Sequence, residues 1–208
     1  MSSIWDMNLR EFRDRTASHA PTPGGGAVAT VAAVEGLALV LMALEVNLRR
    51  KEPHPESAGL LRRGKDLIEL LSVCADEDID AFSRYMKALI LPKDNPEQEQ
   101  ARSRALAIAA SNALEAPLRA AERCLEALTL ARETIGAVHS GIASDVGAGA
   151  ALIHGALTAT LYNVDINLRG IEVPAHRSEA LSTRKDLQRR ADELAYVVQK
   201  ETLAKINK

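Results

Sequence analysis

Aromatic residues are scarce in this sequence: Phe, Trp and Tyr make up 3% of its 208 residues, whereas hydrophobic residues of all kinds make up 47%. A buried core must therefore be built mainly from Ala, Leu, Val and Ile. This composition favours helices that pack closely through small side chains over a sheet rich in β-branched and aromatic residues. No segment shows the period-two alternation of a half-buried strand. We expect an all-α protein.

An excess of basic charge is lacking as well, because 26 Lys and Arg residues stand against 28 Asp and Glu residues. This balance excludes the basic footprint of a nucleic-acid-binding domain, so no nucleic-acid partner is expected. Cysteine occurs twice, as Cys74 and Cys124, and each lies in a helical pattern, which indicates buried thiols in a reducing compartment. The N-terminal MSSIWDMNLREF lacks the charged start and apolar core of a signal peptide. We expect a cytoplasmic protein.

Apolar spacing of three and four residues predicts six helical stretches, with neither an internal repeat nor a low-complexity linker between them. Asn95 and Ser144 are the expected caps of the fourth and fifth stretches, and Pro117 predicts a kink or break in the fourth. The expected stretches cover residues 3–17, from the glycines to about 48, 55–90, 95 onward, 144–169 and 178–206. The sequence predicts one domain over residues 1–208, an elongated bundle of about six long helices.

The second stretch raises the alternative of a membrane span, because only Thr30 and Glu35 are polar between Ala27 and Leu44. A charge near the middle of such a span costs roughly 2.5–3.5 kcal/mol on insertion scales. Ala and Gly are also too frequent for a surface that faces lipid. An apolar helix of this kind is more often the centre of a soluble bundle, so no membrane partner is expected.

Three consecutive glycines precede this stretch in the segment PTPGGGAVAT, residues 21–30. The segment is not a phosphate-binding loop, because no strand precedes it and no Gly-Lys-Ser/Thr ending follows. Glycines at a helix start expose N–H groups on which an anion or a carbonyl oxygen can dock. They also allow a flat ligand or a partner helix to approach the backbone closely.

Asp78 lies on the apolar stripe of the third stretch, where an unpaired charge would be costly to bury. Two interpretations remain open: a buried carboxyl that ties a neighbouring helix, or an acid/base group with a raised pKa. The stripe is counted in steps of three or four residues as Leu60, Gly64, Leu67, Leu71, Ala75, Asp78, Phe82, Tyr85 and Leu89.

One face of the fifth stretch carries Asp145, Asn163 and Asn167. Asp145 and Asn163 are separated by about 27 Å along a continuous helix, so they cannot contact one small ligand within a single subunit. His154 in the same stretch is expected to be a core histidine with its hydrogen bonds satisfied. No histidine pair has metal-ligand spacing, and no metal site is expected.

Four stretches, SHAPTPGGGAVAT, DEDIDAFSRYMKALILPKD, IASDVGAGAAL and LYNVDINLRGI, resemble the cyclodeaminase/cyclohydrolase family in order and spacing. This family comprises the C-terminal domain of formiminotransferase-cyclodeaminase and the stand-alone methenyltetrahydrofolate cyclohydrolases. The resemblance covers about Leu9 to Asn167 and is specific through the combination of Pro-x-Pro-Gly-Gly-Gly and Leu-Pro-Lys. One departure is the segment AVHSGIASD, where the family usually has Gly-Asn-x-Asn before Ser-Asp.

The resemblance implies an all-helical homodimer that acts on folate one-carbon derivatives without a metal or another cofactor. The expected reaction is hydrolysis of 5,10-methenyltetrahydrofolate to 10-formyltetrahydrofolate. Two alternatives stay open: closure of 5-formiminotetrahydrofolate with release of ammonia, and a catalytically idle dimer that binds folate.

The resemblance also implies roles for individual residues. Asp78 would be the general acid/base, and Asp145 a second carboxylate that binds the pterin edge or relays a proton. Lys93 would hold the glutamate tail or stabilise charge on the attacking water. The other expected substrate contacts are Pro23, Gly24, Gly25, Gly26, Phe82, Ser144, Asn163 and Asn167.

Overall fold

The computed structural model describes residues 3–208, and helices connected by short turns account for nearly all of this range. No strand occurs among these residues, which confirms the all-α class. Five helices are long and one is short, where about six long ones were predicted. The helices are α1 (Leu9–Thr16), α2 (Gly25–Leu48), α3 (Ser57–Leu89), α4 (Pro96–Ala137), α5 (Ala143–Asn167) and α6 (Pro174–Ile206), with the 3-10 turns η1 (Ile4–Asp6), η2 (Ser140–Ile142) and η3 (Leu168–Gly170).

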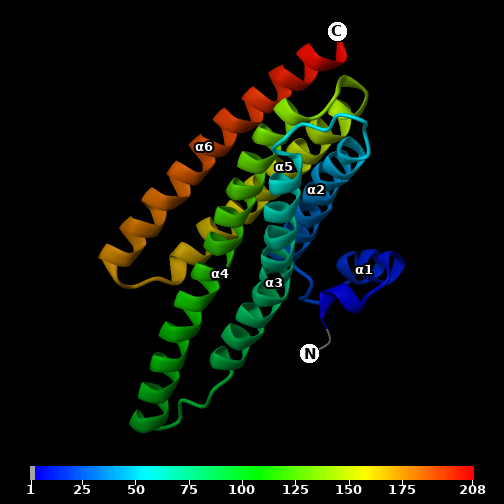
Figure 1. Cartoon of the computed structure of the whole chain (residues 1–208). Helices are drawn as coiled ribbons and strands as arrows, with labels where there is room; N and C mark the ends of the chain where they lie inside the picture. Colours follow the sequence, from blue (N-terminus) through cyan, green and yellow to red (C-terminus); the bar gives the residue numbers. More distant parts are fainter. Residues whose placement is uncertain (1–2) are drawn as a thin grey trace.

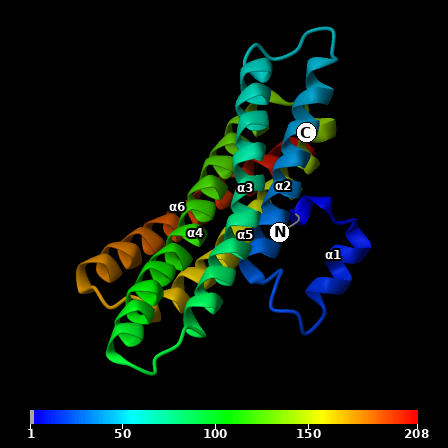
Figure 2. The same cartoon turned by 90° about the horizontal axis from the view of Figure 1, so that it is seen from below.

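Helices α2, α3, α4 and α5 form an elongated four-helix bundle, and α6 packs against α4 and α5 (Figure 1). The α3–α4 hairpin extends past the start of α2 and the end of α5 (Figure 1). Seen from below, α1 stands beside the bundle rather than within it (Figure 2), and none of its residues is buried.

Backbone contact brings α2 and α5 closest together at Gly36 and Gly149. A Cβ added to Gly36 would lie 2.7 Å from the Gly149 carbonyl oxygen, so neither position can carry a side chain without moving a helix. Around this crossing the core is aliphatic, and Leu37, Leu44 and Leu157 are fully buried. The scarcity of aromatic residues is thus matched by close packing of small side chains.

The two apolar helices of the bundle are long enough to cross a membrane by length and composition: α2 and the segment Ser140–Gly170 both qualify among the described residues. In α2, however, 61% of the apolar window is buried inside the protein. Burial on this scale agrees with the expected central helix of a bundle.

The N-terminal prediction of one helix over residues 3–17 is wrong in detail, because the chain forms η1, turns at Met7 and restarts as α1. Ser3 and Asp6 do form a capping box, but it caps the short turn. Asp76 accepts hydrogen bonds from Ser3 Oγ at 2.6 Å and from the Ile4 N–H at 2.8 Å. These contacts fix the N-terminal segment on α3.

The starts of the later helices are predicted with mixed success. Asn95 caps α4 as expected, since its Oδ1 accepts from the Gln98 N–H at 2.9 Å. Ser144 does not cap α5, because that helix already starts at Ala143 and no side chain caps it. Helix α6 begins at Pro174 instead of residue 178, because proline fits the first turn of a helix.

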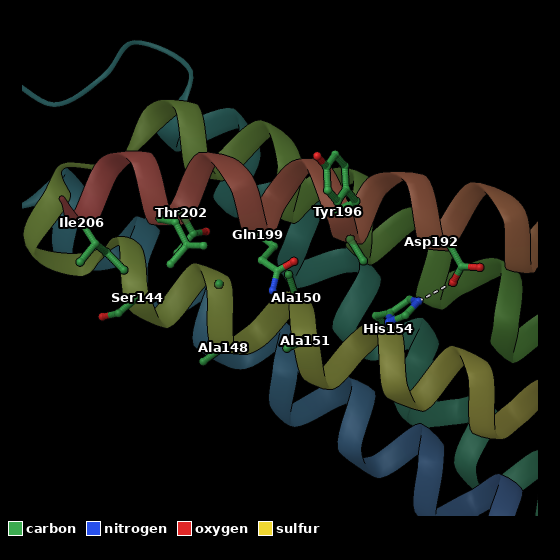
Figure 3. A pocket seen from close by; sticks show the side chains of 13 residues that line it. Ser144, Ala148, Ala150, Ala151, His154, Asp192, Tyr196, Gln199, Thr202 and Ile206 are labelled. Carbon is green, nitrogen blue, oxygen red and sulfur yellow. Dashed lines mark hydrogen bonds and ion pairs between the residues drawn. The ribbon is translucent and has the colours of Figure 1, made fainter. Parts of the chain in front are cut away.

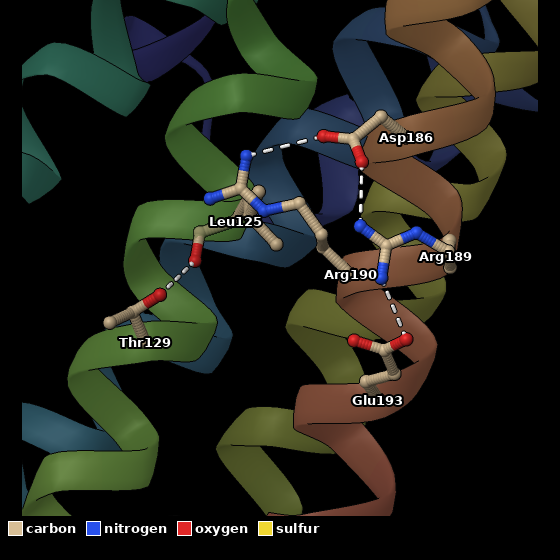
Figure 4. A network of polar contacts seen from close by, with 6 residues as sticks. All are labelled: Leu125, Thr129, Asp186, Arg189, Arg190 and Glu193. Carbon is tan, nitrogen blue, oxygen red and sulfur yellow. Dashed lines mark hydrogen bonds and ion pairs between the residues drawn. The ribbon is translucent and has the colours of Figure 1, made fainter.

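A surface network of charges accompanies the packing of α6 beside α4 (Figure 4). Asp186 accepts from Arg189 at 2.7 Å and from Arg190 at 3.4 Å, and Arg189 also donates to Glu193 at 2.8 Å. Hydrogen bonding from Arg189 lowers the pKa of Asp186. Because the pairs are exposed, water and salt screen them, and α6 is held mainly by buried residues such as Leu187 and Ala191.

Candidate functional site

The start of α2 presents an almost bare backbone. Gly24 is its N-cap and offers no side-chain hydrogen bond, and Gly25 and Gly26 form the first positions of the helix. Pro23, which follows a cis peptide bond, is buried directly before them. The first N–H groups of α2 must therefore find partners elsewhere.

Asp78 of α3 supplies one such partner, because its Oδ2 accepts from the Ala27 N–H at 2.9 Å. A Cβ added to Gly26 would collide with the carboxyl group of Asp78. Gly26, the last of the three glycines, is thus explained by close approach: a carboxylate docks on the positive end of α2. The sequence predicted such docking on the glycines and singled out Asp78, but it did not show that the two belong together.

Burial raises the pKa of Asp78, and the hydrogen bond from Ala27 opposes this shift without cancelling it. Within residues 3–208, no group donates to the other carboxyl oxygen, Oδ1. Both interpretations of Asp78 are therefore compatible with the structure, since one oxygen ties α3 to α2 and the other remains available. A carboxyl with a raised pKa and a free oxygen can take up and return a proton.

Asn163 of α5 lies beside Gly25 at the same helix start. Its Nδ2 is 3.7 Å from the position of a Cβ added to Gly25, and this nitrogen donates to the Ala159 carbonyl at 3.1 Å. A primary amide has two N–H groups and an acceptor oxygen, so Asn163 keeps hydrogen-bonding capacity next to Gly25. Asp78, Gly25, Gly26 and Asn163 together form one corner, which we call the glycine corner.

Asn167, one turn further along α5, is engaged in the fold. Its Nδ2 donates to the Ala113 carbonyl of α4 at 2.6 Å. Pro117 lies four residues after Ala113 and has no N–H to donate, so this carbonyl lacks its usual helical partner. Of the predicted kink or break at Pro117, the break is absent: α4 runs from Pro96 to Ala137, and Asn167 supplies a donor to the carbonyl that Pro117 leaves unpaired.

Phe82 and Lys93 lie on the α3–α4 hairpin, further along the chain than Asp78, which meets the start of α2. Phe82 is 37% exposed, so its predicted place on a buried stripe is wrong. The stripe is buried from Leu60 to Ala75 and only partly covered afterwards, because α2 begins beside Asp78, although Tyr85 still packs against the core. Lys93 is exposed in the turn between the two helices. Both residues can contact a ligand only if it extends from the glycine corner along the hairpin.

Ser144 and Asp145 lie at the far end of α5. Because α5 is continuous from Ala143 to Asn167, the expected separation of about 27 Å between Asp145 and Asn163 holds. The fold of one chain therefore does not bring Asp145 to Asp78. His139 stands in the segment where the family usually has asparagines, and its Nδ1 accepts from the Gly141 N–H at 3.1 Å.

A separate cavity of about 550 Å³ opens between the first half of α5 and the second half of α6, and Ser144 lines it (Figure 3). His154 meets Asp192 there, with Nε2 and Oδ1 2.7 Å apart. The hydrogen bond with His154 lowers the pKa of Asp192. His154 is thus a partly exposed histidine paired across helices, whereas the sequence predicted a core histidine. No sequence signal links the two residues, which are 38 positions apart.

The described residues contain no group of three or more His, Cys, Asp or Glu side chains that could hold a metal ion. Cys74 and Cys124 are both buried, as predicted, and burial raises the pKa of Cys124 to about 12. The fold and the glycine corner define a helical protein that presents a partly buried carboxyl with a raised pKa beside the start of a helix.

Comparison with known proteins supplies the family. The family model for formiminotransferase-cyclodeaminase matches residues 8–186, and the chain belongs to this family. It is 28% identical to the methenyltetrahydrofolate cyclohydrolase of Methylorubrum extorquens, over 96% of this chain and 97% of that protein. It is also 28% identical to the formimidoyltransferase-cyclodeaminase of Sus scrofa, of which the match covers 33%.

The fold has a solved counterpart in the formiminotetrahydrofolate cyclodeaminase from Thermotoga maritima. The two superpose with a TM-score of 0.86 over 97% of this chain and 98% of that chain, at 24% sequence identity. This likeness confirms the helical architecture. The chain spans about a third of the length of the formimidoyltransferase-cyclodeaminases that it matches, but nearly all of the cyclohydrolase.

Proposed function

We propose that the protein is a folate one-carbon enzyme that hydrolyses 5,10-methenyltetrahydrofolate to 10-formyltetrahydrofolate. The full-length similarity to a methenyltetrahydrofolate cyclohydrolase supports this choice. The observation that carries the chemistry is the half-buried carboxyl of Asp78, which has one oxygen on the Ala27 N–H and a pKa raised by burial. The substrate is a small folate molecule, and the reaction needs no cofactor.

Asp78 moves one proton twice in the proposed mechanism. As water attacks the methenyl carbon, the carboxylate takes a proton from the water, and a tetrahedral carbon forms between the two nitrogens. The protonated Asp78 then donates this proton to one nitrogen as its bond to the carbon breaks. The hydroxyl group on that carbon loses its proton to solvent and becomes the formyl carbonyl of the product.

The glycine corner supports this reaction by position. Gly25 leaves the start of α2 open to the flat pterin ring, and Asn163 offers amide groups at its edge. The raised pKa of Asp78 brings its two protonation states closer in free energy near neutral pH, which suits a group that must serve as base and acid in turn.

Spectrophotometry tests the proposal. Purified protein should remove the methenyl absorbance faster than buffer alone, and Asp78→Asn should remove most of the increase. A wild-type rate equal to that of buffer contradicts the cyclohydrolase function. Ammonia release from 5-formiminotetrahydrofolate, measured in parallel, decides whether the cyclodeaminase reaction replaces it, since both reactions pass through a carbon between two nitrogens.

A further inference from the structure

The cavity between α5 and α6 has the size and the lining of a small-molecule site. Its volume of about 550 Å³ lies within the range of roughly 300–1,000 Å³ that is usual for ligand pockets. Small apolar side chains of both helices form much of its wall, among them Ala148, Ala151 and Ala195, and Leu203 adds a larger one. Such a wall fits the apolar body of a ligand, and any polar contact must come from the ends of the cavity.

Within one chain this cavity is separate from the glycine corner. His154, the cavity residue of α5 that lies nearest to the corner, precedes Asn163 by nine residues, which is two and a half turns of α-helix. The two side chains therefore leave α5 on opposite sides. The wall that α6 contributes also lies beyond residue 186, where the match to the family model ends. The proposed folate reaction thus does not account for the cavity.

One end of the cavity carries a carboxylate with a free oxygen (Figure 3). Oδ1 of Asp192 is 2.7 Å from Nε2 of His154 and accepts from Gln188 at 2.8 Å, whereas no side chain within residues 3–208 donates to Oδ2. Hydrogen bonding from His154 lowers the pKa of Asp192, which keeps the carboxyl ionised. In the described part of the chain, no Lys or Arg lines the cavity. This end therefore lacks a cationic partner.

The other end of the cavity carries a buried hydroxyl group. Thr202 lines the cavity and is 7% exposed, and its Oγ1 has no hydrogen-bond partner among the described residues. This oxygen lies 3.1 Å from the position of a Cβ added to Gly147 of α5. An unpaired buried hydroxyl is costly, so we expect its partner to come from outside the chain. Asp192 and Thr202 are ten residues apart on α6, which is about 15 Å along the helix.

We propose that this cavity binds an elongated molecule with a protonated amine at one end, an apolar body, and a hydrogen-bonding group at the other end. The amine donates to Oδ2 of Asp192, the body lies along the alanines of α5 and α6, and the second polar group pairs with the hydroxyl of Thr202. Both contacts use atoms that the fold leaves free, so the ligand displaces no interaction of the chain. The amine stays close to water, because the side chain of Asp192 is 57% exposed.

Calorimetric titration with 8-amino-1-octanol tests the charged end. This probe carries an amine and a hydroxyl group at opposite ends of an apolar chain. It should bind the wild-type protein, and Asp192→Asn should weaken binding by about tenfold, the effect of losing a hydrogen bond to a charged group. The amide oxygen of Asn can still accept from His154, so the fold should persist. No binding by the wild type, no loss in Asp192→Asn, or tighter binding of 8-hydroxyoctanoate than of the amine overturns the proposal.

A second probe tests the end at Thr202. The probe n-octylamine lacks only the hydroxyl group of 8-amino-1-octanol. Thr202→Val keeps the shape of the side chain but removes its hydroxyl, so the ratio of the two affinities should shift toward n-octylamine in this variant. The variant should also be at least as stable as the wild type in urea, because it no longer buries an unpaired hydroxyl. An unchanged ratio of affinities overturns the contact with Thr202 and with it the proposed ligand class.

A bulky side chain on the wall tests the location. Ala151 is exposed and lines the cavity, so Ala151→Trp should fill it and abolish binding without unfolding α5. Ala107→Trp is the matched control, because Ala107 is also exposed in a helix but lies outside the cavity. Circular dichroism checks that both variants keep their helices. Binding by Ala151→Trp as tight as by the wild type overturns the proposal. None of these measurements uses folate, so their outcome is independent of the proposed function.

Discussion

Asp78 and Asn167 each reach a backbone group that a neighbouring helix leaves unpaired, and they differ in what remains available afterwards. Asn167 donates to the Ala113 carbonyl that Pro117 cannot serve, and the contact is neutral. Asp78 accepts from the Ala27 N–H, but it keeps a second oxygen and a pKa raised by burial. The sequence placed both residues in the substrate site. We therefore expect Asn167 to stabilise the fold and Asp78 to take part in the reaction.

The largest expected effect comes from removing the acid/base group. Asp78→Asn should lower kcat by roughly 10²–10⁴-fold, the usual contribution of general acid–base catalysis. The amide oxygen of Asn can still accept from Ala27, so the helix contact and the far-ultraviolet circular dichroism should persist. The control is Asn167→Asp, which replaces an amide by a carboxyl where Asp78→Asn does the reverse. A comparable loss of kcat in Asn167→Asp would contradict the view that only Asp78 is catalytic.

Substitutions of the two glycines of the glycine corner should have different effects, one on kcat and the other on substrate binding. Gly26→Ala introduces a Cβ that must displace the Asp78 carboxyl, so kcat should fall on the order of 10²-fold through misplacement of the base. Gly25→Val meets only Asn163 at ordinary contact distance, so folding is tolerated while the ligand surface is blocked. This variant should raise KM and weaken folate binding. Unchanged folate affinity in Gly25→Val would make the glycines a packing device alone.

Much of the fold was predictable from the sequence, because apolar spacing and composition are local signals. They identified the all-α class, the end of α2 at Leu48 and the cap at Asn95. The continuity of α4 was not predictable, since Asn167 and Ala113 are 54 positions apart and only the folded chain joins them. Phe82 was misplaced for a similar reason: periodicity shows a stripe but not where its covering helix begins.

The candidate site was predictable only in part. Asp78 and the glycines were selected from the sequence, and the structure brings them into contact. Ser144 and Asp145 were selected as well, but continuous helical geometry keeps them at the other end of α5. Spacing along the helix had already predicted that Asp145 and Asn163 lie about 27 Å apart.

A double-mutant cycle should measure the coupling between Asn167 and Pro117. Asn167→Ala leaves the partly buried Ala113 carbonyl without a side-chain partner and should lower the free energy of unfolding by about 0.5–1.5 kcal/mol, the usual net contribution of a hydrogen bond. Pro117→Ala restores an N–H four residues after Ala113, so Asn167→Ala should cost less in that background. Urea titration of all four proteins measures the coupling. Equal costs in both backgrounds would contradict the link between Asn167 and Pro117.

The smallest effect, a dependence of stability on pH, distinguishes the carboxyl from its surroundings. Because the pKa of Asp78 is raised in the folded state, its neutral form is favoured, and this stability is lost as pH rises from the unfolded value through the folded one. Asp78→Asn should therefore gain stability relative to the wild type as pH rises above the ordinary Asp pKa of about 4. Asp186, whose pKa is lowered by Arg189, should give the opposite trend in Asp186→Asn, which loses an advantage present at higher pH. Urea midpoints at several pH values measure both trends, and parallel curves for the two variants would show that Asp78 is not held in a destabilising environment for its charge.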